Sequence, residues 1–254
     1  LENSNILFGV GPKAFEYDLM GNEIHQWQVP GNYGIHHDVI KKSNGNLLVA
    51  VNDYNLETVE DIILELDGSS GSIVNSWDMR EVLDVYRRDL VNDSVDWFHM
   101  NAIWYSEDDN CLVVSGRQQG VVKVTDDNEL VWILAPQKGW GKAGPDSSGH
   151  ETSDYLLTAI DASNSPYGDS VQLGTKDSES FSWPWGQHAP MYLPGGNLFL
   201  YDNGFNRNFI PGVSYSMGIE YEIDETNMTV KQVWQYGRER GPEFQSMIVS
   251  DVDL

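Results

Sequence analysis

The chain has 254 residues, of which 15 are basic and 39 are acidic, so its net charge is −24 at pH 7. A chain of this length buries a sizeable single core, and no second domain is required. The negative charge repels nucleic acid and anionic membrane surfaces, which disfavours a polyanionic partner but leaves open a small anionic substrate bound in a locally positive pocket.

The first predicted element is a β-hairpin at residues 13–27, which alternates apolar and polar side chains, turns at Asp, Gly and Asn, and ends on tryptophan. The same pattern recurs at residues 61–77, 120–132 and 218–234. The closing tryptophans are at positions 27, 77, 132 and 234, so successive gaps are 50, 55 and 102 residues. The first two gaps match a four-stranded propeller blade, which takes roughly 40–50 residues. We therefore predict an all-β propeller of about four blades, whose hairpins each bury one face.

Three units that begin with a histidine lie between these hairpins. Each continues as an extended stretch, turns at Gly, Asn or Asp, and ends in an apolar strand, and the three units are residues 37–53, 99–117 and 188–204. In the first and third units, the histidine and the last Asn of the turn are separated by the same number of positions in the sequence. Equivalent positions of radial repeats lie near one axis, so we expect His37, His99 and His188 to converge.

Residues 136–185 are rich in Gly, Ser, Asp and Pro and lack strand periodicity, which predicts a long inserted loop. In a propeller, the connection from one blade to the next crosses an end of the channel, so we expect this loop to be a lid or pocket wall over the histidines. Residues 1–30 begin in mid-blade, and residues 243–254 have the pattern of an innermost strand. We predict a single propeller portion over residues 1–254, completed by blades outside it.

Two further polar residues are expected at the histidine end of the channel. Asn101 follows His99 by two residues on the same strand face, and Arg117 ends the next strand. Three histidines suit zinc, but the fixed charge of Arg117 opposes a cation. A guanidinium, an amide and imidazoles suit a sulfate or phosphate oxyanion, and a neutral imidazole can be the nucleophile. Because these groups include no clear carboxylate base for water, we favour group transfer over hydrolysis.

His36 is an alternative to His37 as the residue that faces the channel. Strand alternation predicts that the two side chains point to opposite faces, and the repeat register assigns His37 to the inward position. His25 and His150 fall outside the repeat and are interpreted as ordinary polar residues.

The remaining sequence signals indicate structure. Cys111 is the only cysteine and lies in an apolar run, so it is predicted to be a buried thiol without a disulfide partner. No run of 18 apolar residues occurs, which predicts no membrane span. The chain has no glycine-rich phosphate loop, no GxSxG elbow and no HExxH motif, and its acidic turns lack a complete calcium-loop pattern.

Four stretches resemble bacterial arylsulfate sulfotransferases, which work without a nucleotide sulfate donor. They are DWFHMNAIWYSEDDNCLVVSGRQQGVVKV, VWILAPQKGWGK, GQHAPMYLPGGNLFLYDNG and VWQYGRERG, and the likeness extends over roughly residues 30–245. The resemblance implies a six-bladed propeller with a small added N-terminal β domain. This chain is similar to the central portion of such a protein, with the small domain and the other blades missing from it.

The resemblance also implies roles for individual residues. His188 matches the histidine of the family's QH segment, which becomes sulfated. The DWxHxN segment supplies His99 and Asn101, the arginine further along supplies Arg117, and the HHD segment supplies a histidine that the repeat register assigns to His37. All five are family active-site positions.

The implied reaction is a ping-pong transfer of a sulfuryl group from an aryl sulfate to a phenol through a sulfohistidine. The resemblance implies no cofactor and no bound metal, a periplasmic or extracellular location, and a homodimer. The chain has Gln118 where some relatives carry a histidine, and it lacks their cysteine pair in the long loop. Four aromatic residues near the histidines are more typical of packing than of a substrate pocket, namely Trp97, Phe98, Trp183 and Trp185.

Two rival functions remain open from the sequence. One is a hydrolase of sulfate or phosphate esters that uses a histidine-bound metal, and the other is a propeller that binds a ligand without catalysis.

Overall fold

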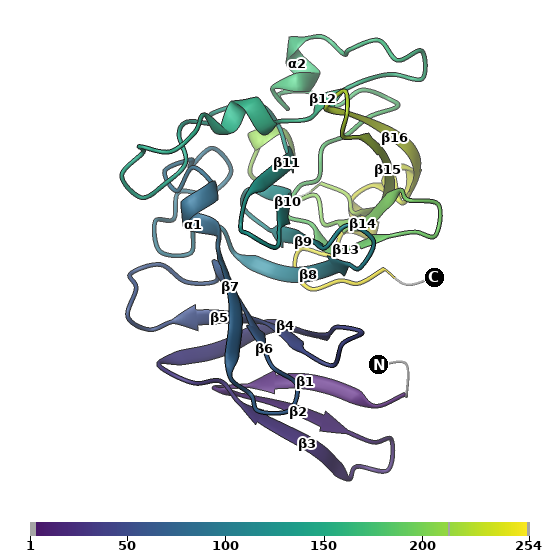
Figure 1. The fold of residues 1–254 in the computed structure, drawn as a ribbon. Helices are drawn as coiled ribbons and strands as arrows, with labels where there is room; N and C mark the ends of the chain where they lie inside the picture. Colours follow the sequence, from purple (N-terminus) through teal and green to yellow (C-terminus); the bar gives the residue numbers. More distant parts are fainter. Residues whose placement is uncertain (1–3, 213, 253–254) are drawn as a thin grey trace.

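The computed structural model describes residues 4–212 and 214–252, and its strands form four sheets that follow one another along the chain (Figure 1). The first sheet has three strands: β1 (Ile6–Val10), β2 (Lys13–Tyr17) and β3 (Glu23–Gln28). The second has four: β4 (Tyr33–Lys41), β5 (Leu47–Asp53), β6 (Ile62–Leu66) and β7 (Ile73–Asp78). The third has β8 (Met100–Ser106), β9 (Cys111–Gly116), β10 (Gly120–Thr125) and β11 (Leu130–Leu134). The fourth has β13 (His188–Tyr192), β14 (Leu198–Asp202), β15 (Met217–Asp224) and β16 (Thr229–Tyr236), with β12 (Thr158–Ala159) outside β16.

Helices are few and short. They are α1 (Met79–Val82), η1 (Thr152–Tyr155), α2 (Asp169–Gln172), η2 (Arg207–Phe209) and η3 (Arg238–Phe244). No helix in the described part of the chain has the length and apolar character needed to cross a membrane.

Within the runs β1–β3, β4–β7, β8–β11 and β13–β16, consecutive strands pair antiparallel, and β8 contacts both β4 and β13. The predicted all-β propeller is therefore confirmed, with four blades, the first of which has three strands. Strands β4, β8 and β13 are the innermost strands of the three complete blades. Each predicted hairpin that ends on tryptophan forms the outer two strands of a blade.

The middle strands of the second and third blades are buried on both faces. Every residue of β6, β9 and the first five positions of β5 is buried, because neighbouring blades cover both sides of these sheets. The prediction of hairpins with a single buried face is therefore wrong for β6 and β10. It is right for β2 and for most of β15, whose exposure alternates along the strand. The apolar side chains form three core clusters, each between two consecutive blades.

Tryptophans of the outer strands tie each blade to the next one. The indole N–H of Trp27 donates to the carbonyl of Gly68 at 2.8 Å, and that of Trp77 donates to the carbonyl of Thr125 at 2.9 Å. Trp132 donates in the same way to a carboxylate oxygen of Glu225 at 2.8 Å. In each case the acceptor lies at the outer hairpin of the following blade. The repeated tryptophan is thus an interblade contact that combines burial with a hydrogen bond.

The inner strands share a backbone distortion at the histidines. His37 and His99 have φ of 46° and 55°, and Ala189, next to His188, has φ of 50°. The pairing of all three inner strands with their neighbours shifts register at this level. A left-handed residue at a bulge interrupts the alternation of side chains and re-aims them.

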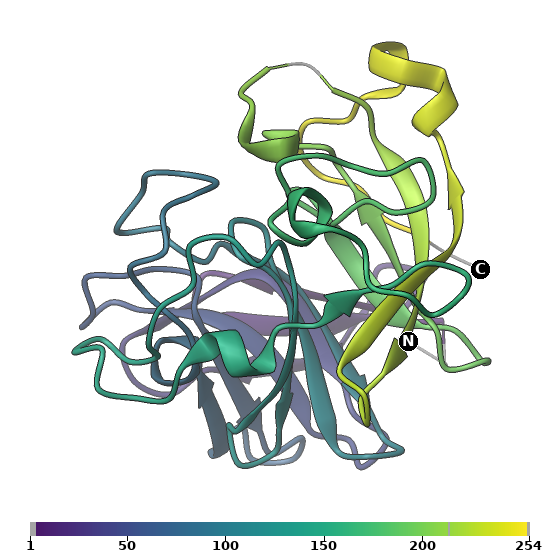
Figure 2. The same ribbon diagram turned by 90° about the horizontal axis from the view of Figure 1, so that it is seen from above.

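The part of the segment between β11 and β13 that carries β12 and α2 lies beside the fourth blade (Figure 2), whereas its first part lies beside the preceding blades. Its strand β12 pairs parallel with β16, and the indole N–H of Trp183 donates to the carbonyl of Val171 at 2.7 Å. Near its start, the N–H of Gly141 donates to Asp84 in the preceding interblade connection at 2.8 Å. None of residues 136–185 lines the cavity at the histidines described below, so the expected pocket wall comes from elsewhere.

That wall comes from the final part of the chain. The guanidinium of Arg117 donates to the carbonyl of Met247 at 3.5 Å, and Ser246 and Ser250 bond to Asn203. Residues 245–252 carry no strand pairing, so the innermost strand predicted at 243–254 is not formed over its described residues, and residues 253–254 lie outside them. The segment instead passes over the ends of inner strands.

We expect replacement of Trp77 by Ala to lower the free energy of unfolding by about 3–5 kcal/mol, because it opens a cavity between two blades and removes a buried hydrogen bond. Trp234→Ala is the matched control, since this tryptophan is 46% exposed and its loss should cost at most about 1 kcal/mol. Urea denaturation of the two variants measures both values. If the two variants lose the same free energy of unfolding, the interblade position of Trp77 adds no stability beyond that of an exposed tryptophan.

Candidate active site

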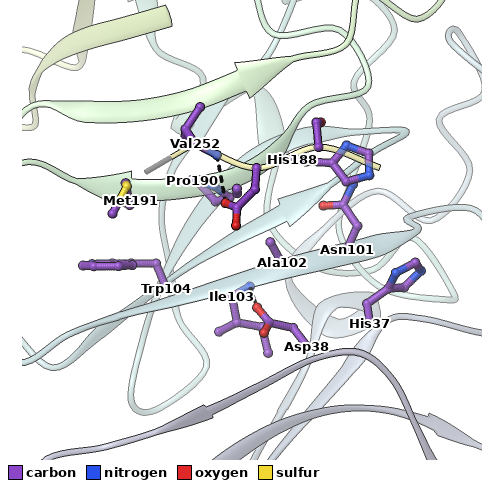
Figure 3. Close-up of a pocket in the computed structure, with 13 residues that line it drawn as sticks. His37, Asp38, Asn101, Ala102, Ile103, Trp104, His188, Pro190, Met191 and Val252 are labelled. Atoms are coloured by element: carbon purple, nitrogen blue, oxygen red, sulfur yellow. Dashed lines mark hydrogen bonds between the residues drawn. The ribbon is translucent and has the colours of Figure 1, made fainter. Parts of the chain in front are cut away.

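The three repeated histidines lie at the same end of adjacent inner strands. His37 is within β4, His99 directly precedes β8, and His188 begins β13. The ring centroids of His37 and His99 are 5.2 Å apart. His37, Asn101 and His188 line a cavity of about 300 Å³, and Figure 3 shows His188 beside Asn101 with His37 on the neighbouring strand.

The ring of His188 is held from one side. Its Nδ1 lies 2.7 Å from Oδ1 of Asn203, the residue that follows β14. An amide oxygen only accepts hydrogen bonds, so Nδ1 is the protonated nitrogen and Nε2 of the neutral ring keeps its lone pair. Burial lowers the pKa of His188 and the charge of Arg117 lowers it further, while the bond to Asn203 opposes both effects. The imidazole is therefore neutral at neutral pH.

His37 and His99 are held by carboxylates instead. Oε2 of Glu60 lies 3.3 Å from Nε2 of His37 and 3.1 Å from Nδ1 of His99. Oδ2 of Asp96 lies 2.6 Å from the same Nδ1 of His99. The hydrogen bond to Glu60 raises the pKa of His37 above its usual value, although burial opposes the shift. Burial by itself would raise the pKa of Glu60, but the bond from His37 and the nearby imidazoles bring it below its usual value.

His36 does not point away from His37. The two ring centroids are 5.4 Å apart, so the prediction of opposite faces is wrong. The reason is the left-handed backbone of His37, which interrupts the alternation of the strand. Burial lowers the pKa of His36 to about 4, and only His37 of this pair lines the cavity.

Asn101 and Arg117 complete the set of predicted residues, in different ways. The amide of Asn101 donates to the carbonyl of Gln187 at 2.8 Å, which fixes the residue just before His188. The guanidinium of Arg117 lies over the ring of Phe205 at 4.3 Å, and its Nε is buried with no hydrogen-bond partner in the described structure. Arg117 is outside the lining of the cavity but close enough for its charge to act on His188.

Three polar residues of this site were not predicted from the sequence. Asp96 and Glu60 are carboxylates beside the histidines, where no clear carboxylate base for water was expected, and the third residue is Asn203. Asp96 carried a signal, because it stands three residues before His99 in the same segment. The sequence position of Asn203 was also informative, because Asn203 directly follows β14 just as Arg117 directly follows β9. Glu60 lies in a loop before β6, and nothing in the sequence marks it.

The aromatic residues near the histidines belong to the core. Trp97, Phe98, Trp183 and Trp185 are all buried, and none lines the cavity. Trp97 donates its indole N–H to Asp61 at 2.9 Å. These side chains pack the site from behind.

Two overlapping groups of side chains could hold a metal ion. One combines His36, His37 and Glu60, the other Glu60, Asp96 and His99, and within each group the ligand atoms lie within 4.8 Å of one another. Imidazole and carboxylate are ligands that zinc accepts. Some of these atoms already have partners, because Asp96 bonds to His99 and Oε2 of Glu60 forms ion pairs with His37 and His99.

The fold and the site together define an all-β propeller fold whose inner strands bring imidazoles together. Residues 1–254 match the model of the Arylsulfotransferase (ASST) family, and the chain belongs to this family.

Two curated relatives are similar over nearly the whole chain. Arylsulfate sulfotransferase AssT of Escherichia coli O6:H1 is 30% identical over 292 aligned positions, which cover 96% of this chain and 47% of that protein. The protein of the same name from Lelliottia amnigena is 30% identical over 291 positions, with the same coverage. The chain therefore spans about half the length of these relatives.

Solved structures give a more distant likeness. The beta-propeller domain of Cps50 (Swd1) from Myceliophteria thermophila is 9% identical, with a TM-score of 0.45, over 92% of this chain and 56% of that one. A hypothetical selenium-binding protein from Sulfolobus tokodaii is 10% identical, with a TM-score of 0.48, over 95% of this chain and 54% of that one.

Replacing Glu60 by Gln should lower the pKa of His37, because the contact of its Nε2–H with the Glu60 carboxylate is what raises it. The raised pKa means that the pair stabilises the fold at low pH and that this contribution is lost as the pH rises through the folded pKa. An NMR titration of the His37 ring measures the change. Glu107→Gln is the control, because Glu107 lies beyond the far end of β8, and it should leave the titration unchanged. An unchanged pKa of His37 in Glu60→Gln would contradict the assignment.

Proposed function

We propose that the protein transfers a sulfuryl group from an aryl sulfate to a phenol in two steps, with His188 as the residue that is sulfated between them. The observation that carries this proposal is the neutral ring of His188, whose Nδ1–H is bonded to Asn203 and whose Nε2 is left as the nucleophilic nitrogen. The relatives named arylsulfate sulfotransferases support the class of reaction.

In the first step, Nε2 of His188 attacks sulfur, the N–S bond forms, and the bond from sulfur to the aryl oxygen breaks. The departing aryl oxygen needs a proton, and His37 is suited to give it, because Glu60 favours its protonated form. In the second step, a phenol enters, returns a proton to His37, and its oxygen takes the sulfuryl group from His188. The imidazole is then neutral again and the proton balance is restored.

The charge of the sulfuryl group needs compensation during both steps. Arg117 supplies a fixed positive charge near His188, and its Nε is free to donate. Asn101 lines the same cavity. Donors fixed before the reaction stabilise developing charge more than water does, because they need no reorientation.

A metal-dependent hydrolase is the second candidate, and one observation favours it. Glu60 is shared by the two groups of potential metal ligands, and it could serve as a base for water. We prefer the transferase, because a metal-dependent hydrolysis would not use the neutral ring of His188 or the positive charge of Arg117.

Replacement of His188 by Asn should abolish both the burst of phenol release from an aryl sulfate and transfer to an added phenol. In the unmodified protein, donor turnover should accelerate with acceptor and give parallel double-reciprocal lines. Mass spectrometry of donor-treated protein should find one sulfuryl group on the peptide with His188. If the donor is hydrolysed at a steady rate that is independent of added phenol and abolished by a chelator, the protein is a metal-dependent hydrolase instead.

Arg117→Lys keeps the positive charge but loses the planar fork of donors, so we expect kcat/KM for sulfuryl transfer to fall at least ~10²-fold. Lys142→Arg, on the segment outside the cavity, is a control for exchanging the two cation types and should leave the kinetics unchanged. Unchanged kinetics in Arg117→Lys would remove Arg117 from the reaction.

The location outside the cytoplasm and the homodimer that the resemblance implies stay predictions.

A further inference from the structure

We infer that Asn203 is the positioning residue that sets the tautomer of His188 and thereby directs its nucleophilic nitrogen to the sulfuryl donor. The inference rests on the proposed function for its catalytic meaning, while the tautomer itself is a property of the protein without substrate. In water, neutral histidine prefers the proton on Nε2, so a ring with the proton on Nδ1 needs a dedicated acceptor.

The orientation of the Asn203 amide is fixed by its second contact. Its Nδ2 donates to the carbonyl of Ser246 at 3.0 Å, so its Oδ1 is the atom that faces His188 at 2.7 Å. Turning the amide over would place oxygen against the Ser246 carbonyl and an N–H₂ group against Nδ1 of the ring. The hydroxyl of Ser250 also donates to Oδ1, at 3.2 Å, which agrees with this orientation of the amide.

Asn203 is itself held rigidly. Its side chain is fully buried, and its carbonyl accepts a hydrogen bond from the hydroxyl of Ser216 at 2.9 Å. The preceding residue, Asp202, accepts bonds from the N–H of Trp185 and from the guanidinium of Arg207, each below 3.0 Å. A positioning residue works only when its own geometry is fixed by a second set of bonds.

The chemistry of the partner distinguishes His188 from His37. A carboxylate holds His37 and favours its charged form, whereas an amide holds His188 and leaves it neutral. The charged groups that act on His188 are Arg117 and His37, and Asp251 lines the same cavity. An uncharged acceptor at position 203 therefore orients the ring without making it a cation, which is the state that a nucleophile needs.

The first test measures the tautomer by ¹⁵N NMR of the histidine rings at a pH where His188 is neutral. We expect protonated Nδ1 and bare Nε2 in the unmodified protein, and a shift toward protonated Nε2 in Asn203→Ala. Asn197→Ala is the matched control, because Asn197 precedes the same strand β14 at its other end and bonds to Glu220. It should leave the His188 signals unchanged. A proton on Nε2 in the unmodified protein, or an unchanged tautomer in Asn203→Ala, would overturn the inference.

The second test measures the burst rate of phenol release at saturating aryl sulfate over a range of pH. Asn203→Ala should be at least ~10-fold slower than Asn197→Ala, because the wrong nitrogen faces the donor. Asn203→Asp keeps the acceptor oxygen, so it should retain the Nδ1–H tautomer while the acid limb of its profile moves to higher pH.

This second variant also serves if Asn203→Ala does not fold. An Asn203→Asp profile that coincides with that of the unmodified protein would count against the positioning role. The expected tautomers combined with no sulfated His188 in the unmodified protein would support the positioning role and contradict the sulfuryl transfer, so the two failures are distinguishable.

Discussion

The structure depends on the packing of each blade against the next one. A single four-stranded sheet has two apolar faces here, and only neighbouring sheets cover them, as the buried runs of β5, β6 and β9 indicate. The three core clusters therefore lie between blades and not within them. This arrangement also brings the first strands of the blades together, because sheets that pack face to face in a radial array meet at their inner edges. The site at their ends is a geometric result of the same burial.

Within that site, the partner of each imidazole decides what the ring can do. Glu60 and Asp96 surround His99, Glu60 also holds His37, and the amide of Asn203 holds His188. The contact with Glu60 thus raises the pKa of His37, whereas burial lowers the pKa of His188. Side chains of one type whose pKa values are moved apart are suited to different roles in acid–base and nucleophilic chemistry.

Much of this organisation could be predicted from local sequence. The hairpins that end on Trp27, Trp77 and Trp132 follow from alternation and turn residues, and the repeat places three histidines at one end of the channel. The orientation of His36 could not be predicted, because the alternation rule assumes a regular strand and His37 is at a bulge. Glu60 could not be predicted either, since a loop residue acquires its place from the fold as a whole.

The terminal stretch 246–252 gives the site a dependence on distant parts of the chain. Its residues bond to the amide of Asn203 and to Arg117. Ser250 and Asp251 line the same cavity as His37, which lies more than 200 positions earlier in the sequence. The inner strands β4, β8 and β13 all precede this stretch in the sequence. The surroundings of His188 are therefore completed by a segment outside the paired strands, so a substitution in residues 246–252 would loosen Asn203 and Arg117 without unpairing any blade.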